Sequence, residues 1–293
     1  AGPDPTPPRP AGLPRSRTIP SMQPVPEDAI VARRELLLAG VLLVALARAV
    51  EGPAAWGMVA VVLVAMFLAV VGIAGIDRGM PAVCAAIVPA VLVAGAAAVV
   101  RLVPVGLWLV VVIAVAAMLL DRVLRLELRL LRQPAGPSPG DRSRVLLSVV
   151  VTGFVAFAGV AALVPGGLAE PAANGVRTGP LAEEWLAALV VGDGIAAALL
   201  GFRLASFRYA TIRTVVLSAL TYATLIAIAA GAARAIDLPR LVGPAVLALV
   251  LYLWDAVHGT SPARRREPRF VWEVLLLAVL GVVVVAWNLQ LRG

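Results

Sequence analysis

The sequence predicts an all-α, polytopic integral membrane protein. Of the 293 residues, 61% are hydrophobic and 14% are charged, whereas soluble domains have about 45–50% apolar and about 25% charged residues. The apolar residues form long continuous runs, and about 20 such residues are needed to cross a hydrocarbon core. The runs lack the polar–apolar alternation of membrane β-barrels, so we expect helices.

A proline-rich tail precedes the first apolar run. Residues 1–34 contain nine prolines and almost no large apolar side chains, so we expect a disordered cytoplasmic tail. Its segment Pro7 to Pro10 has the PxxP form that aromatic grooves bind.

About nine membrane-spanning helices are expected after this tail. The apolar runs are Leu36–Val50, Ala54–Ile76, Ala82–Val100, Leu102–Leu120, Val145–Val164, Leu181–Phe202, Thr214–Ala233, Leu241–Val257 and Val271–Trp287. The first run is short and carries Arg48, and only Arg101 separates the third run from the fourth. A count of eight helices therefore stays open.

The arginines predict how the helices are oriented. With nine crossings and a cytoplasmic N-terminus, 19 of the 25 basic residues, all of them arginine, fall on the cytoplasmic side. The other side receives Arg48, Arg101, Arg177, Arg234, Arg240 and Arg292. Because cytoplasmic loops carry an excess of basic residues, this arrangement places the C-terminus outside.

A linker rich in proline, glycine and serine divides the chain into two helical blocks. We expect a first block of four spanning helices over 35–132, a cytoplasmic linker over 133–144 and a second block of five over 145–293. Whether the blocks are a repeat, as in many transporters, stays open.

Asp193 is the candidate intramembrane functional acid. It lies near the middle of the sixth run, between Gly192 and Gly194, where a carboxylate costs about 3 kcal/mol on insertion scales. Such a residue suits a proton relay or a cation-coupling site. The alternative is a structural hydrogen bond to a neighbouring helix, with Thr152, Ser218 or Thr221 as partner. No basic partner is evident in the sequence.

Four arginines follow the fourth run on one helical face. Arg122, Arg125, Arg129 and Arg132 are spaced by three, four and three residues, opposite Leu124, Leu128 and Leu131. We expect this amphipathic extension to contact anionic lipid headgroups at the inner leaflet, or to bind a partner.

A further candidate pair lies at the cytoplasmic end of the eighth run. Asp255 and His258 are three residues apart, so they share a helical face and could share a proton. An interface anchor with a satisfied histidine is the alternative.

The composition excludes several kinds of chemistry. Cys84 and His258 are the only residues of their types and lysine is absent, so intramolecular disulfides, thiolate metal clusters and lysine Schiff bases are ruled out. We expect no metal and no cofactor. The net charge of +8 lies in loops, which favours anionic lipids over nucleic acid.

The final 60 or so residues resemble uncharacterised bacterial multi-pass membrane families of unknown function. The resemblance rests on Leu253-Trp254-Asp255 and Ala286-Trp287-Asn288, which end the last two helices. It implies no activity and no functional residues.

The first functional hypothesis is a non-enzymatic accessory or scaffold subunit of a bacterial inner-membrane assembly, bound to another membrane protein or to a second copy of itself. The alternative is a small-solute or proton-coupled transporter that uses Asp193. The third hypothesis is a lipid-linked membrane enzyme. It ranks last because the paired acids or the nucleophile that such an enzyme needs are not evident in the sequence.

Overall fold

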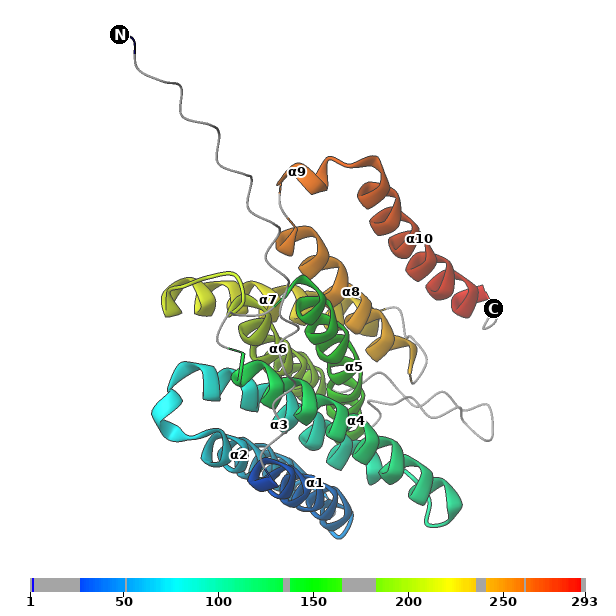
Figure 1. Ribbon diagram of the computed structural model, residues 1–293. Coiled ribbons are helices and arrows are strands. Elements are labelled where there is room, and N and C mark those ends of the chain that lie inside the picture. The colour runs from blue at the N-terminus through cyan, green and yellow to red at the C-terminus, as the bar shows by residue number, and fades with distance from the viewer. Residues whose placement is uncertain are drawn as a thin grey trace.

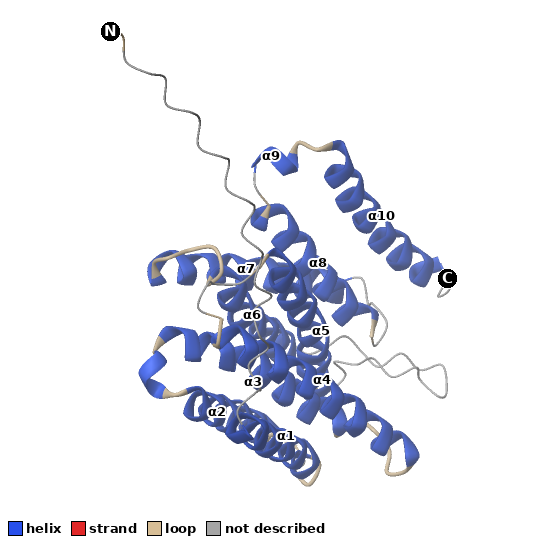
Figure 2. Ribbon diagram, in the orientation of Figure 1, coloured by secondary structure: helices blue, strands red, loops and turns tan. Residues whose placement is uncertain are grey.

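The computed structural model describes residues 2, 27–50, 52–133, 138–164, 183–235, 241–260 and 262–290. Within these ranges the regular structure is entirely helical, which confirms the all-α prediction there (Figure 2). The helices are α1 (Glu27–Ala47), α2 (Ala54–Ala74), the 3-10 turn η1 (Ile76–Arg78), α3 (Met80–Val100), α4 (Leu107–Leu131), α5 (Pro139–Leu163), α6 (Glu183–Ala205), α7 (Ile212–Ala235), α8 (Val242–Gly259), α9 (Pro262–Arg265) and α10 (Pro268–Gln290).

Eight of the described helices are long and apolar enough to cross a membrane, namely α2 to α8 and α10. A chain with these helices fits a multi-pass membrane protein. Helix α1 corresponds to the first predicted run, but Arg33, Arg34 and Glu35 interrupt its apolar sequence. Of the nine predicted runs, the one at α1 is therefore the run that the eight candidate spans of the described residues do not include.

Helix α1 begins at Glu27, so its first eight residues overlap the tail that was predicted to end at residue 34. A contact with another helix accompanies the earlier start: Arg33 forms an ion pair with Asp121 of α4 at 3.5 Å. The disordered-tail prediction for residues 3–26, with its PxxP segment, lies outside the described residues.

Helix α3 is the centre of the bundle. Nearly all of its residues from Ala82 to Val100 are buried, and it packs against α1, α2, α4, α5 and α6. Because α3 belongs to the first predicted block and α5 and α6 to the second, the two blocks share one core. At the edges of the bundle lie α1 and α2 on one side and α10, beside α8, on the other (Figure 1).

Two glycines let the backbones of α3 and α5 touch. A Cβ atom built on Gly95 of α3 would lie 2.8 Å from the Cα atom of Ala156, and one on Gly159 of α5 would lie 2.7 Å from the carbonyl oxygen of Gly95. Small residues at such crossings are typical of membrane helices, whose association depends on close van der Waals packing. This contact holds the two predicted blocks together.

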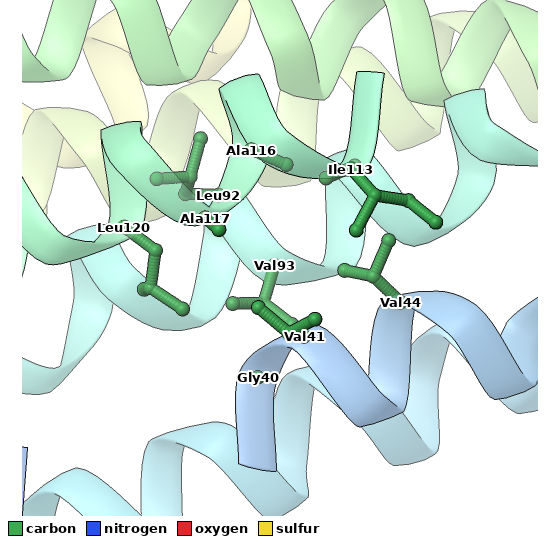
Figure 3. A pocket seen from close by; sticks show the side chains of 10 residues that line it. Gly40, Val41, Val44, Leu92, Val93, Ile113, Ala116, Ala117 and Leu120 are labelled. Atoms are coloured by element: carbon green, nitrogen blue, oxygen red, sulfur yellow. The ribbon is translucent and has the colours of Figure 1, made fainter. Parts of the chain in front are cut away.

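Helix α1 packs on α3 and α4 in a similar way. Figure 3 shows Gly40 and Val44 of α1 facing Val93 of α3 and Ile113 and Leu120 of α4. The space left between them is about 10 Å³, roughly the volume that one water needs. Since its lining is apolar, we regard it as a packing gap and not as a ligand site.

Contacts between loops and helix ends agree with an alternating helix direction. At one end, Arg48 donates hydrogen bonds to the carbonyl oxygens of Val100, at 3.0 Å, and Val103. These oxygens lie at and beyond the C-terminus of α3, where helical partners run out. At the opposite end, Arg33 meets Asp121. We call this second end, where α4 and α6 finish and α5 and α7 begin, the arginine-rich end.

Candidate functional site

A cleft of about 780 Å³ opens at the arginine-rich end. It lies between the start of α3, the end of α4, the end of α6 and the start of α7, and we call it the polar cleft. Its polar lining includes Glu127, Gln133, Arg203 and Ser206, while most of its wall is apolar.

An ion pair between Glu127 of α4 and Arg203 of α6 lies in the wall of the polar cleft. Arg203 donates from Nε to Oε1 of Glu127 at 3.1 Å and from Nη2 to Oε2 at 2.5 Å. The two side chains are almost fully buried, with exposed fractions of 0% for Glu127 and 6% for Arg203. This bidentate geometry is the strongest form of a guanidinium–carboxylate contact.

The remaining groups of Arg203 are also engaged. Its Nη1 donates to the hydroxyl of Ser206 at 3.3 Å, and its guanidinium carbon lies 4.2 Å from the centre of the Phe207 ring. The hydroxyl of Ser206 donates in turn to the carbonyl oxygen of Arg203 at 2.7 Å. The cleft therefore holds a neutralised pair of charges and not an unbalanced one.

Glu127 was not among the predicted site residues, although its position in the sequence carried a signal. Glu127 falls on the leucine face of the predicted arginine helix, beside Leu124 and Leu128, and all three are buried. An acid on an apolar face indicates a partner on another helix. That partner, Arg203, lies 76 residues away in the chain.

Gln133 is among the residues that line the polar cleft, and its side chain carries a buried oxygen. It precedes Ser138 and Asp141, which form the capping box of α5. Its carbonyl oxygen Oε1 is buried and accepts no hydrogen bond from any residue in the described ranges. A buried acceptor without a donor costs about 1–3 kcal/mol.

Asp193 lies deeper in the bundle on α6, and its side chain is 1% exposed. Its neighbour Gly192 faces Val160 of α5, and Gly194 faces Ala227 of α7. The oxygen Oδ1 of Asp193 has no hydrogen-bond partner among the described residues. The predicted acid is therefore placed inside the protein, between helices.

The predicted hydrogen-bond partners of Asp193 lie elsewhere. Gly153 of α5 packs against Leu200, so the adjacent Thr152 is about seven residues, or about 10 Å, from the level of Asp193. Thr221 of α7 is exposed, whereas Asp193 is buried. Thr221 instead donates to the carbonyl oxygen of Ser218 at 2.7 Å.

The surroundings of Asp193 include a basic residue that the sequence did not make evident. Arg234 of α7 is close enough to act electrostatically on the Asp193 carboxylate. Sequence spacing could not reveal it, because the two residues are brought together only by the packing of α6 against α7. Arg203, the arginine that shares α6 with Asp193, is instead paired with Glu127.

Asp255 and His258 do not form the predicted pair. Asp255 accepts hydrogen bonds from Tyr222, at 2.7 Å, and from Arg208. The Nδ1 atom of His258 lies 3.0 Å from the carbonyl oxygen of Trp254, and the Trp254 and His258 rings stack at 3.8 Å between centroids. The interface-anchor alternative describes this histidine better.

Arg208 and Tyr222 complete a second buried polar group at the arginine-rich end. Arg208 donates to the Tyr222 hydroxyl at 3.2 Å as well as to Asp255. Burial by itself would lower the pKa of Arg208, but the charge of Asp255 and the contact with Tyr222 raise it above its usual value. Arg208 therefore stays charged and ties the loop between α6 and α7 to α8.

The predicted arginine face continues α4 without a break. Arg122, Arg125, Arg129 and Arg132 are all exposed, and Leu124 and Leu128 are buried on the other side. Arg125 forms an ion pair with Asp121 one turn earlier. The geometry leaves the arginines available to lipid headgroups or to a partner, and that role stays a prediction.

Metal chemistry finds no support in the parts of the chain that the structure describes. There, no three histidine, cysteine, aspartate or glutamate side chains come together closely enough to hold an ion.

No protein-family model, curated protein or solved structure matches the chain. The polar cleft and Asp193 are therefore the features of the described residues that bear on function.

Proposed function

We propose that this multi-pass membrane protein carries a small solute or protons across the membrane, with Asp193 as the intramembrane acid. The observation that carries the proposal is the unpartnered Oδ1 atom of Asp193 inside an apolar bundle. A membrane-buried carboxylate costs about 3 kcal/mol on insertion scales. A protein that serves only as a support gains nothing from that cost, whereas a transporter needs such a group.

The polar cleft supports the same proposal. Arg203, in its wall, follows Asp193 by ten residues on α6, which corresponds to about 15 Å along the helix. A solute that enters from the arginine-rich end thus finds polar groups first and the buried acid further along the same helix. By the positive-inside rule we propose that this end faces the cytoplasm of a bacterial inner membrane.

Asp193→Asn should reduce proton flux at least about tenfold, because the amide keeps the shape of the side chain but cannot carry a proton. The measurement uses purified protein in vesicles that contain a pH-sensitive dye, with a potassium gradient and valinomycin to set the voltage. Unchanged flux in Asp193→Asn would reject Asp193 as the transport acid.

Thr152→Val is the matched control for this experiment. Thr152 is also buried and its hydroxyl also lacks a hydrogen-bond partner within the described residues, but it carries no titrating proton. We expect Thr152→Val to keep the flux of the parent. We also expect Asp193→Asn to unfold at the same or a higher temperature, since a purely structural acid would show a loss of stability instead.

A second candidate function is the accessory or scaffold subunit, and α10 favours it. No residue of its spanning segment is buried, and it approaches the bundle where Gly281 meets Leu249 of α8. Its face with Leu276 and Val283 is exposed. That face is free to contact another membrane protein or lipid.

Bulky substitutions on α10 test the subunit function. Leu276→Trp with Val283→Trp should remove a co-purifying membrane protein, because lipid adapts to added bulk and a packed interface does not. The measurement is native mass spectrometry after mild extraction from the source membrane. Leu68→Trp on the exposed face of α2 is the control. A chain that travels alone before any substitution would contradict the subunit function.

A further inference from the structure

The mouth and the floor of the polar cleft differ in exposure. The mouth consists of exposed lining residues, namely Met80, Pro81, Tyr209, Ala210 and Ile212. The floor consists of buried lining residues, namely Cys84, Ala85, Glu127, Arg203 and Val215. The volume of about 780 Å³ lies within the range of about 300–1,000 Å³ for small-molecule sites. The cleft therefore has room for the apolar part of an amphiphile.

The interior of the polar cleft suits an uncharged chain. Glu127 and Arg203 neutralise each other through two hydrogen bonds, so a charged group inside would lose its hydration without gaining an unpaired charge of opposite sign from them. The half-buried side chains of Leu130, Phe202 and Phe207 add apolar wall. An acyl chain would be bound there through the hydrophobic effect.

The mouth lies at the level of phospholipid headgroups. The candidate spans around it begin at Met80 and Ile212 and end at Leu131 and Ala205. Since such termini mark the boundary between the hydrocarbon core and water, a lipid at this place has its head at the mouth and its chains toward the core.

Two exposed arginines adjoin the lining in sequence. Arg132, at the end of α4, stands between the lining residues Leu131 and Gln133, and Arg213 of α7 follows the lining residue Ile212. Neither side chain forms an ion pair or a hydrogen bond with another of the described residues. Because neighbouring Cα atoms are about 3.8 Å apart, both guanidinium groups can reach the mouth and bind an anion there.

Tyr209 adds a hydroxyl donor to the mouth. It lies in the loop between α6 and α7 and is 42% exposed. Tyrosine is enriched at membrane–water interfaces, where its ring meets apolar groups and its hydroxyl meets polar ones. The nearby turn η1 contributes one acid, Asp77, and one base, Arg78, whose charges cancel. The arginines beside the lining therefore leave the mouth positive.

We infer that the polar cleft binds one anionic phospholipid, with its phosphate at the mouth and an acyl chain inside. The phosphate accepts hydrogen bonds from Arg132, Arg213 and Tyr209, and the chain lies against Phe202 and Phe207. The inference rests on the lining and the charges of the cleft and not on Asp193, so it goes beyond the proposed transport. If the cleft is also the entrance for a solute, the bound lipid competes with that solute.

Native mass spectrometry of the purified full chain in detergent tests the preference for an anionic head. The protein is titrated with phosphatidylglycerol and with phosphatidylcholine of the same acyl chains. We expect phosphatidylglycerol to bind its first site about twentyfold more tightly, which is about fivefold for each arginine beside an anionic lipid. Glycerol phosphate, the head without a chain, should not displace it.

Paired substitutions assign this preference to the mouth. Arg132→Gln with Arg213→Gln should abolish it, and Tyr209→Phe should weaken phosphatidylglycerol binding about fivefold, the effect of one net hydrogen bond. Arg34→Gln with Arg122→Gln is the matched control. These two arginines are also exposed at the arginine-rich end, but neither adjoins a lining residue. The control removes the same charge and should keep the preference.

Cross-linking tests the position of the acyl chain. A phosphatidylglycerol with a diazirine on one chain loses N₂ on irradiation and inserts into a nearby bond. We expect the attached lipid on peptides that contain residues 80–85 or 202–215, and an excess of unlabelled phosphatidylglycerol should remove it. Phosphatidylcholine at the same excess should remove much less.

Four results would overturn the inference. They are equal binding of the two lipids, displacement by glycerol phosphate, the same loss of preference in the control pair as in Arg132→Gln with Arg213→Gln, and cross-links only outside the two expected peptides. Proton flux does not enter these measurements. A failure of lipid binding therefore leaves the transport proposal standing, and an absence of flux leaves the lipid site standing.

Discussion

Glu127→Gln is expected to destabilise the folded protein by about 3–5 kcal/mol, the usual cost of breaking a buried ion pair from one side. The amide leaves the guanidinium of Arg203 buried at 6% exposure without a counter-charge. The pair also joins α4 to α6 in the wall of the polar cleft, so its loss should loosen that wall. The measurement is the unfolding temperature in detergent, followed by size-exclusion chromatography.

Two further variants make this result specific. Removing both charges, in Glu127→Leu with Arg203→Leu, should restore most of the stability, because no buried charge is then unpaired. Glu273→Gln is the control, since Glu273 forms an exposed pair with Arg269 on α10 at 3.1 Å, and exposed pairs contribute little. If Glu127→Gln unfolded at the same temperature as the Glu273→Gln control, the pair of Glu127 and Arg203 would not be buried in the membrane-embedded protein.

Gly95→Val is expected to prevent assembly of the bundle. The added Cβ atom would lie 2.8–2.9 Å from the backbone of Ala156 on α5, and a backbone cannot move aside as a flexible side chain can. Overpacking of a core costs about 1–3 kcal/mol and often more. We expect aggregated or unfolded protein on size-exclusion chromatography and a large fall in the unfolding temperature of any folded remainder.

Gly231→Val is the matched control for this substitution. Gly231 is also helical, on α7, but nothing lies within 4 Å of the position its Cβ would take. The same change of residue type should therefore leave the unfolding temperature close to that of the parent. Equal behaviour of the two variants would mean that α3 and α5 do not meet at Gly95.

The segments that form long helices could be predicted from the sequence, because a bilayer sets the length of apolar run that is needed to cross it. Each long helix in the described residues overlaps a predicted run, and the arginine face of α4 lies where helical spacing placed it. The prediction did not identify the central helix. Helices α3 and α10 are similarly apolar, yet α3 is buried and α10 is not. Apolar sequence alone cannot tell the two apart, because lipid and the protein interior are equally apolar surroundings.

The site was harder to predict than the fold. Asp193 could be singled out because a carboxylate in an apolar run is costly wherever it faces. The pairing of Glu127 with Arg203, and the approach of Arg234 to Asp193, depend on how whole helices rotate against one another. Nothing in local spacing sets that rotation. The glycines of α3 and α5 contribute to it, and only the structure shows which glycines meet.

The distance in sequence between Glu127 and Arg203 has a consequence for biogenesis. The two residues are 76 positions apart, and at about 5–20 residues per second the ribosome needs about 4–15 s to add the arginine after the glutamate. During that interval the carboxylate of Glu127 has no partner. Its place near the end of α4 lets it stay in interfacial water until α6 arrives, so the polar cleft closes around its ion pair only after the second half of the chain has been inserted.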